Sequence, residues 1–193
     1  MKIKLEKIAT VQAGYSFRSR LETLDSGAVA VIQMKDLTSA NLVDCSKLVR
    51  VGMEVPNEHH LVKSGDLIFR SRGLTANSAL LAEDPGCAVL AAPLLRIRTT
   101  SKRILPEYLN WFISQRPAQF YFTSCASGTA LKMISKQSLE NLEVDVPPLA
   151  QQHLIVELAA LAEEEQHILK SLAGKRRQYI STTLLQLAQG ELL

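Results

Sequence analysis

Val146-Pro147-Pro148-Leu149-Ala150-Gln151-Gln152 is the stretch that divides this sequence into two parts. Before it, short apolar runs alternate with glycines and prolines. Over residues 149–188 the chain has no proline, and Gly174 is the one glycine there. A proline pair disfavours helix in the residue before it but suits the first turn of a helix. The pair therefore predicts a long helix that begins near Pro148.

Apolar residues recur after the proline pair at spacings of three and four, which is the pattern of an amphipathic helix. They include Leu154, Ile155, Leu158, Leu161, Ile168, Leu169, Leu172, Tyr179, Ile180, Leu184 and Leu187. Such a helix would be about 57 Å long, more than a compact domain of this size can cover. We therefore expect it to project and to pair as a coiled coil, within this chain or between chains. A two-helix hairpin broken at Gly174 is the alternative.

The charges of this helix favour one direction of pairing between two copies. Residues 163–165 are all glutamate, and residues 175–177 are Lys-Arg-Arg. In a parallel dimer each block would face its own copy, whereas an antiparallel dimer centred near Lys170 brings opposite charges together. The predicted dimerisation residues are Leu158, Leu161, Ile168, Leu172 and Tyr179. The alternative is that both blocks form solvated helix faces.

The part before the proline pair predicts short strands. Leu5, Ile8 and Val11, followed by Gly14, predict a short amphipathic helix with a glycine stop. Five apolar runs bounded by Gly, Pro, Asp or Ser then have the length of strands. They cover residues 28–32, 66–70, 79–82, 88–90 and 94–98.

Two more helices and a strand complete this part. A helix is predicted over residues 106–113, ending before Pro117, and a short one over residues 135–141, followed by a strand over 142–146. The expected fold class is α+β. Residues 1–148 would form a small mixed α/β domain with a mostly β centre, and residues 149–193 a long C-terminal coiled-coil helix.

Composition narrows the class of protein. The chain has 193 residues, of which 47% are hydrophobic and 21% charged, as in a soluble globular protein. No apolar run is long enough to span a membrane, and the N-terminus lacks the apolar segment of a signal peptide. We therefore expect a cytoplasmic protein with no membrane partner. The length leaves no room for a two-domain enzyme with a large cofactor fold.

The residue patterns of common catalytic and metal sites do not occur. Cys45, Cys87 and Cys125 are far apart in the sequence and are expected to be reduced core residues. The four histidines lack the spacing that directs two imidazoles at one metal ion. Phosphate-loop, dinucleotide, esterase and metalloprotease motifs are missing, and no Glu-x-Lys near Asp66 and Arg70 completes a nuclease site. We therefore predict no catalytic residue, no metal and no cofactor.

Three loops of the first part carry residues suited to DNA. Residues 1–149 hold 18 of the 22 Lys and Arg and 14 of the 19 Asp and Glu, so the basic excess lies there. Arginine can pair with guanine and asparagine with adenine through two hydrogen bonds. The predicted DNA-binding residues are Tyr15, Arg18, Arg20, Arg70, Arg72, Thr75, Asn77, Thr129, Lys132 and Lys136. Taken alone, each loop has a solvated surface turn as its alternative.

The order of these segments resembles the specificity subunit of type I restriction-modification systems. In that family a target-recognition domain is followed by a PPLxxQ segment that opens a long spacer helix, and Pro147, Pro148, Leu149 and Gln152 match it. Further matching stretches are residues 5–9, 14–17, 65–73, 128–129 and 134–135, and Leu139. The sequence holds one copy of this pattern, whereas family members usually carry two. It therefore resembles a half-length subunit or the N-terminal half of a longer one.

This resemblance implies a non-enzymatic subunit that binds one half of a bipartite site in double-stranded DNA. The helix would space the recognition domains and dock methyltransferase subunits. Methyl transfer, ATP-driven translocation and cleavage would reside in the methyltransferase and restriction subunits. A homodimer through antiparallel C-terminal helices is the expected assembly. The alternatives are a protein-interaction adaptor or inhibitor that has lost DNA recognition, and a stand-alone enzyme with a hidden site.

Overall fold

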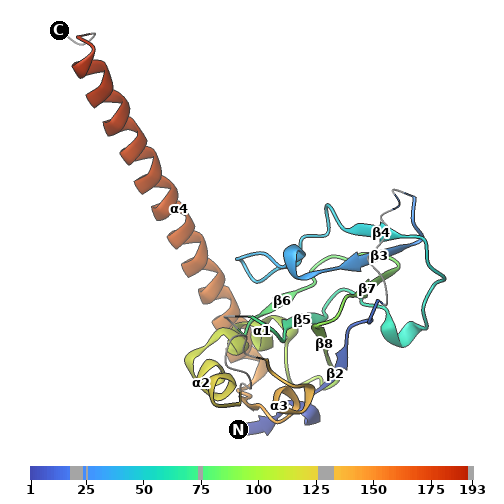
Figure 1. The fold of residues 1–193 in the computed structure, drawn as a ribbon. Helices are drawn as coiled ribbons and strands as arrows, with labels where there is room; N and C mark the ends of the chain where they lie inside the picture. The colour runs from blue at the N-terminus through green and yellow to red at the C-terminus, as the bar shows by residue number, and fades with distance from the viewer. Residues whose placement is uncertain (18–23, 25, 74–75, 126–132, 191–193) are drawn as a thin grey trace. The chain divides into compact units, whose positions relative to one another are not determined.

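The computed structural model describes residues 1–17, 24, 26–73, 76–125 and 133–190. The chain forms two compact units, Met1–His153 and Leu154–Leu193. The first unit is a mixed α+β domain and the second is helical, which confirms the predicted fold class. In Figure 1 a four-stranded sheet lies between a three-stranded sheet and the short helices of the first unit.

The four-stranded sheet is antiparallel throughout. Its order is β2 (Ala9–Ala13), β8 (Leu94–Thr99), β5 (Leu67–Arg70) and β6 (Ser78–Leu80). Ile97 of β8 is paired with Val11 on one side and with Leu67 on the other. All three side chains are buried, so the central strand is covered by apolar neighbours along the sheet.

The three-stranded sheet has the order β4 (Val49–Val51), β3 (Val29–Ile32) and β7 (Ala88–Leu90), with β3 and β7 parallel. One core cluster joins the two sheets, because Ile32 of β3 packs with Ile68 of β5 and Leu94 of β8. The three cysteines are unpaired and half-buried, so they lie at the margin of the core and not within it.

The first and last strands of the domain pair with each other. β1 (Lys2–Lys4) is antiparallel to β9 (Glu143–Asp145), and the Val146 N–H donates to the Met1 carbonyl at 2.9 Å. The beginning of the domain therefore lies beside the residues that precede the proline pair.

The helix predicted around Leu5, Ile8 and Val11 is wrong. The structure has a 3-10 turn, η1 (Leu5–Lys7), followed by strand β2. Buried residues three apart occur because the turn buries Leu5 and the strand buries Val11, so two short elements imitate one helical period. Gly14 is therefore not a helix stop. Two further 3-10 turns, η2 (Met34–Asp36) and η3 (Glu58–His60), were not predicted.

Two of the short helices, α1 and α3, lie where the sequence predicts a helix, and a third, α2, was not predicted. α1 (Pro106–Ser114) begins at the expected proline, and α3 (Lys136–Glu140) is capped by the Ser135 hydroxyl, which accepts from the Ser138 N–H. Helix α2 (Arg116–Cys125) was not expected. Pro117 is its second residue, where a proline costs no internal hydrogen bond, so this proline starts a helix as well as ending one.

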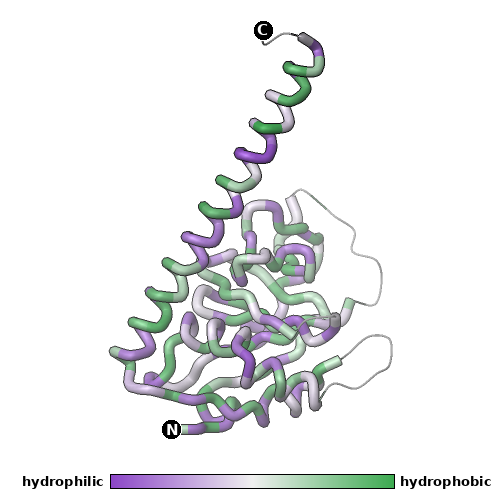
Figure 2. Tube along the Cα trace, turned by 90° about the vertical axis from the view of Figure 1, so that its left-hand side faces the viewer, coloured by the Kyte–Doolittle hydropathy of each residue, from purple (hydrophilic) through white to green (hydrophobic). Residues whose placement is uncertain are grey.

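The long helix α4 (Leu149–Ala188) runs without interruption through Gly174, so the two-helix hairpin alternative is wrong. Figure 2 shows hydrophobic and hydrophilic residues alternating along it. Its leucines from Leu154 to Leu187, with Ile168, Tyr179 and Ile180, are exposed, whereas Ile155 and Val156 are half-buried. No helix of the described residues is long and apolar enough to cross a membrane.

Gln152 is the one buried residue that the structure describes in α4. Its side-chain oxygen accepts from the Leu105 N–H at 2.9 Å, which caps the start of α1. Its amide nitrogen donates to the carbonyls of Arg103 at 2.8 Å and Pro147 at 2.7 Å. A side chain of this length with one acceptor and two donors is needed here, which gives a physical reason for the glutamine of the PPLxxQ segment.

Candidate nucleic-acid interface

The structure brings the first two predicted loops together at the turn that joins β7 to β8. The Tyr15 N–H donates to the Leu90 carbonyl at 2.6 Å, and the Ala92 N–H donates to the Tyr15 carbonyl at 3.0 Å. From the other side, the Ser71 hydroxyl donates to the Pro93 carbonyl. The two loops therefore flank one short turn.

Gly14 allows the first loop to approach this turn so closely. A Cβ atom at Gly14 would lie 2.9 Å from both the carbonyl carbon of Ala91 and the carbonyl oxygen of Leu90. Both atoms belong to backbone and cannot move aside without disturbing the turn. The glycine is thus required by packing between two segments that are distant in sequence.

The third predicted loop joins the second through backbone pairing. Arg72 and Met133 form an isolated antiparallel bridge, and the Ile134 N–H donates to the Ser71 carbonyl at 2.8 Å. Lys136 follows at the start of α3. All three loops chosen from composition therefore meet in one region of the domain.

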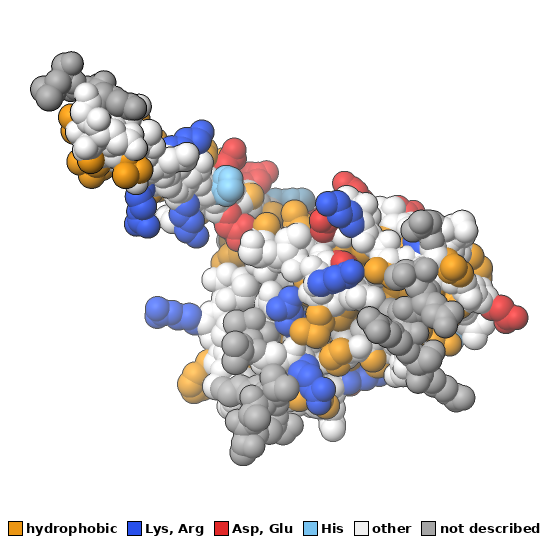
Figure 3. Space-filling view, turned by 45° about the horizontal axis from the view of Figure 1, so that its top comes forward, with side chains coloured by type: hydrophobic (Ala, Val, Ile, Leu, Met, Phe, Trp, Pro, Cys, Tyr) orange, Lys and Arg blue, Asp and Glu red, His pale blue; other side chains and the backbone are white. Residues whose placement is uncertain are grey.

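We call the described parts of these loops the loop surface: residues 15–17, 70–73, 76–77 and 133–136. These residues include three cations, Arg70, Arg72 and Lys136, and no aspartate or glutamate. An acid-free cationic surface attracts a polyanion at long range. In Figure 3, one face of the domain shows Lys and Arg side chains lying among hydrophobic ones.

The two arginines of the second loop have different surroundings. Arg72 is exposed. Arg70 is half-buried, and its guanidinium donates to the Met34 carbonyl at 3.1 Å, while its Nε atom is buried and has no partner among the described residues. Arg72 is therefore free to reach a ligand, whereas Arg70 also holds the η2 turn.

Asn77 lies at the end of the second loop, where its backbone carbonyl accepts from the Arg70 N–H at 2.9 Å. Its side-chain oxygen is buried without a partner among the described residues. The neighbouring Ala76 carbonyl accepts from the Gln119 amide of α2 at 2.6 Å. Gln119 positions this loop, and sequence reasoning missed it because a single glutamine in a short helix carries no pattern.

Tyr15 belongs to an aromatic cluster and is half-buried. Its ring centroid lies 4.9 Å from that of Phe17 and 5.6 Å from that of His60. Partial burial, His59 and Arg96 lower the pKa of His60. The His60 Nδ1 atom lies 3.4 Å from the Gln12 amide nitrogen, which favours a neutral ring that accepts there.

The other predicted DNA-binding residues are less constrained or not described. Lys136 is exposed and lies 3.5 Å from the Glu140 carboxylate, one helical turn away. Arg18, Arg20, Thr75, Thr129 and Lys132 lie outside the described residues. The assignment of all these residues to DNA stays a prediction.

Asp66 has a structural partner. Its buried carboxylate accepts from Nε and Nη2 of Arg98, each at 2.6 Å. The nearby Arg96 guanidinium donates to the Leu61 carbonyl at 2.7 Å and to the Gln12 side-chain oxygen at 2.6 Å. Within the part of the chain that the structure describes, no group of three His, Cys, Asp or Glu residues could hold a metal ion.

A family model described as the type I restriction modification DNA specificity domain matches residues 1–163. The chain belongs to this family. The resemblance of its motifs to the specificity subunit is thereby confirmed. This family of specificity subunits is generally non-catalytic. No curated protein matches the chain.

Solved structures with the specificity-domain fold cover the whole chain. The HsdS subunit from Thermoanaerobacter tengcongensis aligns with a TM-score of 0.69 at 18% identity, and the S subunit from M. genitalium with 0.58 at 13%. A third structure, from work on complex assembly and conformational transition of the type I R-M system, aligns with 0.64 at 17%. The chain spans 49%, 46% and 44% of these three proteins, respectively, which is less than half of each.

Proposed function

We propose that this specificity-domain chain reads one half of a bipartite target in duplex DNA and performs no chemical step itself. The observation that carries this proposal is the meeting of three loops, distant in sequence, in one surface that contains Arg70, Arg72 and Lys136. The described residues of these loops include no carboxylate, and Glu140 lies beside them, 3.5 Å from Lys136. Phosphate contacts from exposed cations would fix the register of the domain on DNA, and polar side chains of the loop surface would contact base edges.

Methyl transfer and cleavage are assigned to partner subunits of the same restriction-modification complex. Family membership supports methyltransferase subunits as partners, and an ATP-dependent restriction subunit would complete the complex. The specificity chain would then act by positioning these enzymes on a chosen DNA sequence.

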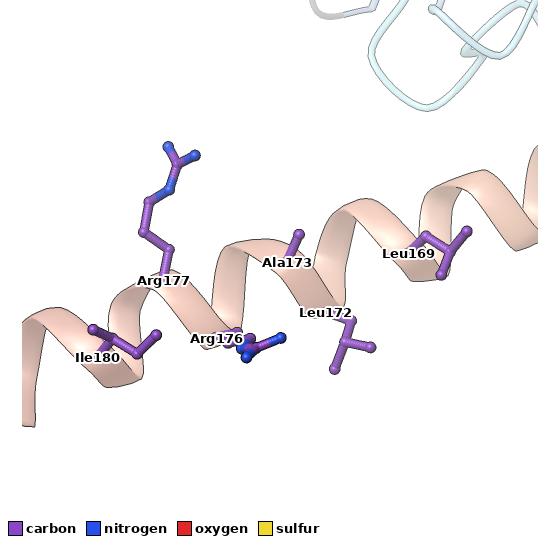
Figure 4. Close-up of a pocket in the computed structure, with 6 residues that line it drawn as sticks. All are labelled: Leu169, Leu172, Ala173, Arg176, Arg177 and Ile180. Atoms are coloured by element: carbon purple, nitrogen blue, oxygen red, sulfur yellow. The ribbon is translucent and has the colours of Figure 1, made fainter.

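We further propose that α4 pairs with a second copy of itself. Apolar side chains in the middle of α4, between Leu161 and Ile180, line two shallow grooves on the helix surface. The groove in Figure 4 is lined by Leu169, Leu172, Ala173, Arg176, Arg177 and Ile180. In this view, the Arg176 side chain extends along the helix towards Leu172, whereas the Arg177 side chain points away from the helix. The second groove is lined by Leu161, Glu164, Glu165, Ile168 and Leu169.

The two grooves are complementary in charge, which supports antiparallel pairing. One carries arginines and the other glutamates, and an axis near Lys170 places Ile168 of one helix opposite Leu172 of the other. Glu164 and Glu165 then lie across from residues 175–177. Exposed ion pairs contribute only about 0–1 kcal/mol each, so the charges select the direction while the apolar side chains supply the free energy of association.

A two-fold dimer presents two identical recognition domains, so its target would be an inverted repeat with an unread gap. Half-sites one turn of DNA apart, or somewhat more, are expected. Because the chain spans less than half of its structural relatives, the second half of a longer protein is the other possible occupant of the helix face. In that case the two half-sites would differ in sequence.

Selection of binding sites from a randomised duplex pool tests the proposal. The purified chain should enrich one short motif, and the homodimer predicts that this motif occurs twice in inverted order at fixed spacing. Enrichment of a single copy would support DNA recognition without self-pairing. If no motif is enriched, the chain is an adaptor that keeps the fold without reading DNA.

A further inference from the structure

Phe120 is the most exposed of the large hydrophobic residues that the structure describes, with 80% of its surface accessible to solvent. It lies on the outer face of α2. Ala118 and Phe122, two residues before and after it, are buried, and the Phe122 ring lies 5.2 Å from the ring of Phe69 in β5. Residues two apart point to opposite sides of a helix, so Phe120 is directed away from the core.

The position of Phe120 is fixed by its two neighbours. The Gln119 amide donates to the Ala76 carbonyl at 2.6 Å, which ties α2 to the second loop. The Tyr121 hydroxyl donates to the Ser138 carbonyl of α3 at 2.8 Å. Phe120 therefore stands between the two contacts that attach α2 to the loop surface and to the helix that begins with Lys136. The aromatic ring is presented by a rigid element beside the predicted DNA-binding loops.

The chemistry around Phe120 continues that of the loop surface. Helix α2 has no aspartate or glutamate, and exposed Arg116 lies one turn before Phe120 on the same face. Met133, which is paired with Arg72, has 43% of its surface exposed. Apolar side chains between cations, with no carboxylate among them, fit a ligand that has both phosphates and stacked apolar rings. Duplex DNA has both, since proteins insert apolar side chains between base steps while arginines hold the backbone.

We propose that Phe120 is a DNA-contacting side chain that inserts against a base step next to the bases read by the loop surface. The assignment rests on the proposed function, because it requires that the domain bind DNA. Helix α2 and the loop surface contribute no carboxylate of their own, and the neighbouring Glu140 is paired with Lys136, which favours this polyanion over a protein partner. Phe120 would thereby add affinity and a preference for easily unstacked steps, such as pyrimidine–purine steps.

The test uses the duplex that the wild-type chain itself selects from a randomised pool, and a scrambled duplex of equal composition. Phe120→Ala should weaken binding to the selected duplex about 10- to 100-fold, the effect expected for loss of a base–aromatic contact. Phe120→Trp should retain most of the affinity. Val55→Ala, which also truncates a 63% exposed apolar side chain but outside the loop surface, should change nothing. The unfolding temperature of Phe120→Ala should match the wild type.

A second readout detects the insertion directly. With 2-aminopurine placed in turn at the steps of the selected site, wild-type binding should raise fluorescence at one step, and Phe120→Ala should abolish that rise. Equal affinity and equal fluorescence for the two proteins would overturn the proposal. Unchanged DNA binding with lost association of a methyltransferase subunit would overturn it in favour of a protein contact. A wild-type chain that binds no duplex at all would overturn the proposed function and this inference together.

Discussion

Arg98 donates two hydrogen bonds to Asp66, from Nε and Nη2, each at 2.6 Å and each to a different carboxylate oxygen. The Lys63 N–H also donates to this carboxylate at 2.9 Å, and Arg98 donates to the Leu61 carbonyl at 3.0 Å. The pair therefore attaches the segment before β5 to strand β8. Among the described residues, Asp66 is the one acid with no exposed surface.

Loss of one partner should destabilise the domain strongly. Asp66→Ala leaves the Arg98 guanidinium without its anion and is expected to lower the free energy of unfolding by about 3 kcal/mol. We place the effect at the lower end of the usual range because a quarter of the Arg98 side chain is exposed to solvent, at 25%. Urea unfolding measures it, with Glu54→Gln as the exposed control. A loss below about 0.5 kcal/mol would contradict a structural role for the pair.

Gln152 should be needed for stability in a way that its neighbour is not. Gln152→Ala leaves the Leu105 N–H and the carbonyls of Arg103 and Pro147 without partners, which should cost about 2–4 kcal/mol. Gln152→Glu should also destabilise, because a carboxylate would face two carbonyl oxygens. Gln151→Ala, at the adjacent exposed position, is the matched control and should shift the unfolding midpoint little. Equal unfolding midpoints for the two alanine variants would refute this stabilising role of the Gln152 hydrogen bonds.

Arg72 should contribute to DNA affinity through phosphate. Its exposed side chain is expected to release about one counterion, so Arg72→Ala should weaken binding to all duplexes and lower the salt slope by about one unit. Lys47→Ala, an exposed cation outside the loop surface, serves as the control. Arg70→Ala should also lower stability, because it frees the Met34 carbonyl. Unchanged affinity of the Arg70/Arg72 double alanine variant at two salt concentrations would reject this loop as a contact.

His60 should make the domain less stable as the pH falls. Partial burial, His59 and Arg96 hold the pKa of His60 below the ordinary value of 6.5 in the folded protein. The unfolded chain then binds the proton more tightly, so the contribution of His60 is complete above about pH 6.5 and declines as the pH falls towards the folded pKa. The free energy of unfolding should fall more between pH 7 and pH 5 for the wild type than for His60→Gln. An NMR titration in which His60 protonates at or above pH 6.5 would contradict this.

Spin labels can establish the direction of helix pairing. With three native cysteines replaced and one label per chain, antiparallel pairing about Lys170 separates two labels by about 3 Å along the axis for each residue from the centre. Copies of residue 178 should therefore be about 24 Å apart, and copies of residue 186 about 48 Å apart. Parallel pairing gives one short distance at both positions.

Charge reversal supplies an independent control for the same prediction. The variant E163K/E164K/E165K places like charges across an antiparallel seam and should weaken self-association, as should K175E/R176E/R177E. Combining the six substitutions exchanges the blocks and should restore the dimer. In a parallel dimer the first variant would repel no more than the wild type, so its association would not change. Sedimentation or light scattering measures each case.

Strands β3 and β5 to β9 and helix α4 could be predicted because their evidence is local, whereas β2 was predicted as helix, and β1 and β4, which hold no continuous apolar run, were not predicted. Apolar runs bounded by turn residues become strands, and the proline pair marks the start of α4 within one residue. The error at residues 5–11 arose where a 3-10 turn and a strand share one apparent period. Helix α2 could not be predicted because a proline such as Pro117 suits both the position just after a helix and the first turn of the next one.

The residues of the candidate site could be predicted from the residue types in three loops, but the contact between these loops in the folded domain could not. It depends on the approach of Gly14 to Ala91 and on the pairing of Arg72 with Met133, which join segments far apart in the chain. Gln119 and Phe120 were overlooked for a related reason. A lone polar or aromatic residue acquires significance only from what the fold places beside it.

The pairing of β1 with β9 places the two ends of the domain side by side. The chain enters through its first strand and leaves beside it, where the Val146 N–H meets the Met1 carbonyl. Domains with adjacent ends tolerate transplantation. A gene segment that encodes residues 1–146 can therefore be exchanged for another as a cassette, with the start of α4 unaltered. Under the proposed function, such an exchange would change the DNA preference in one step, without altering the helix that is proposed to join the chain to its partners.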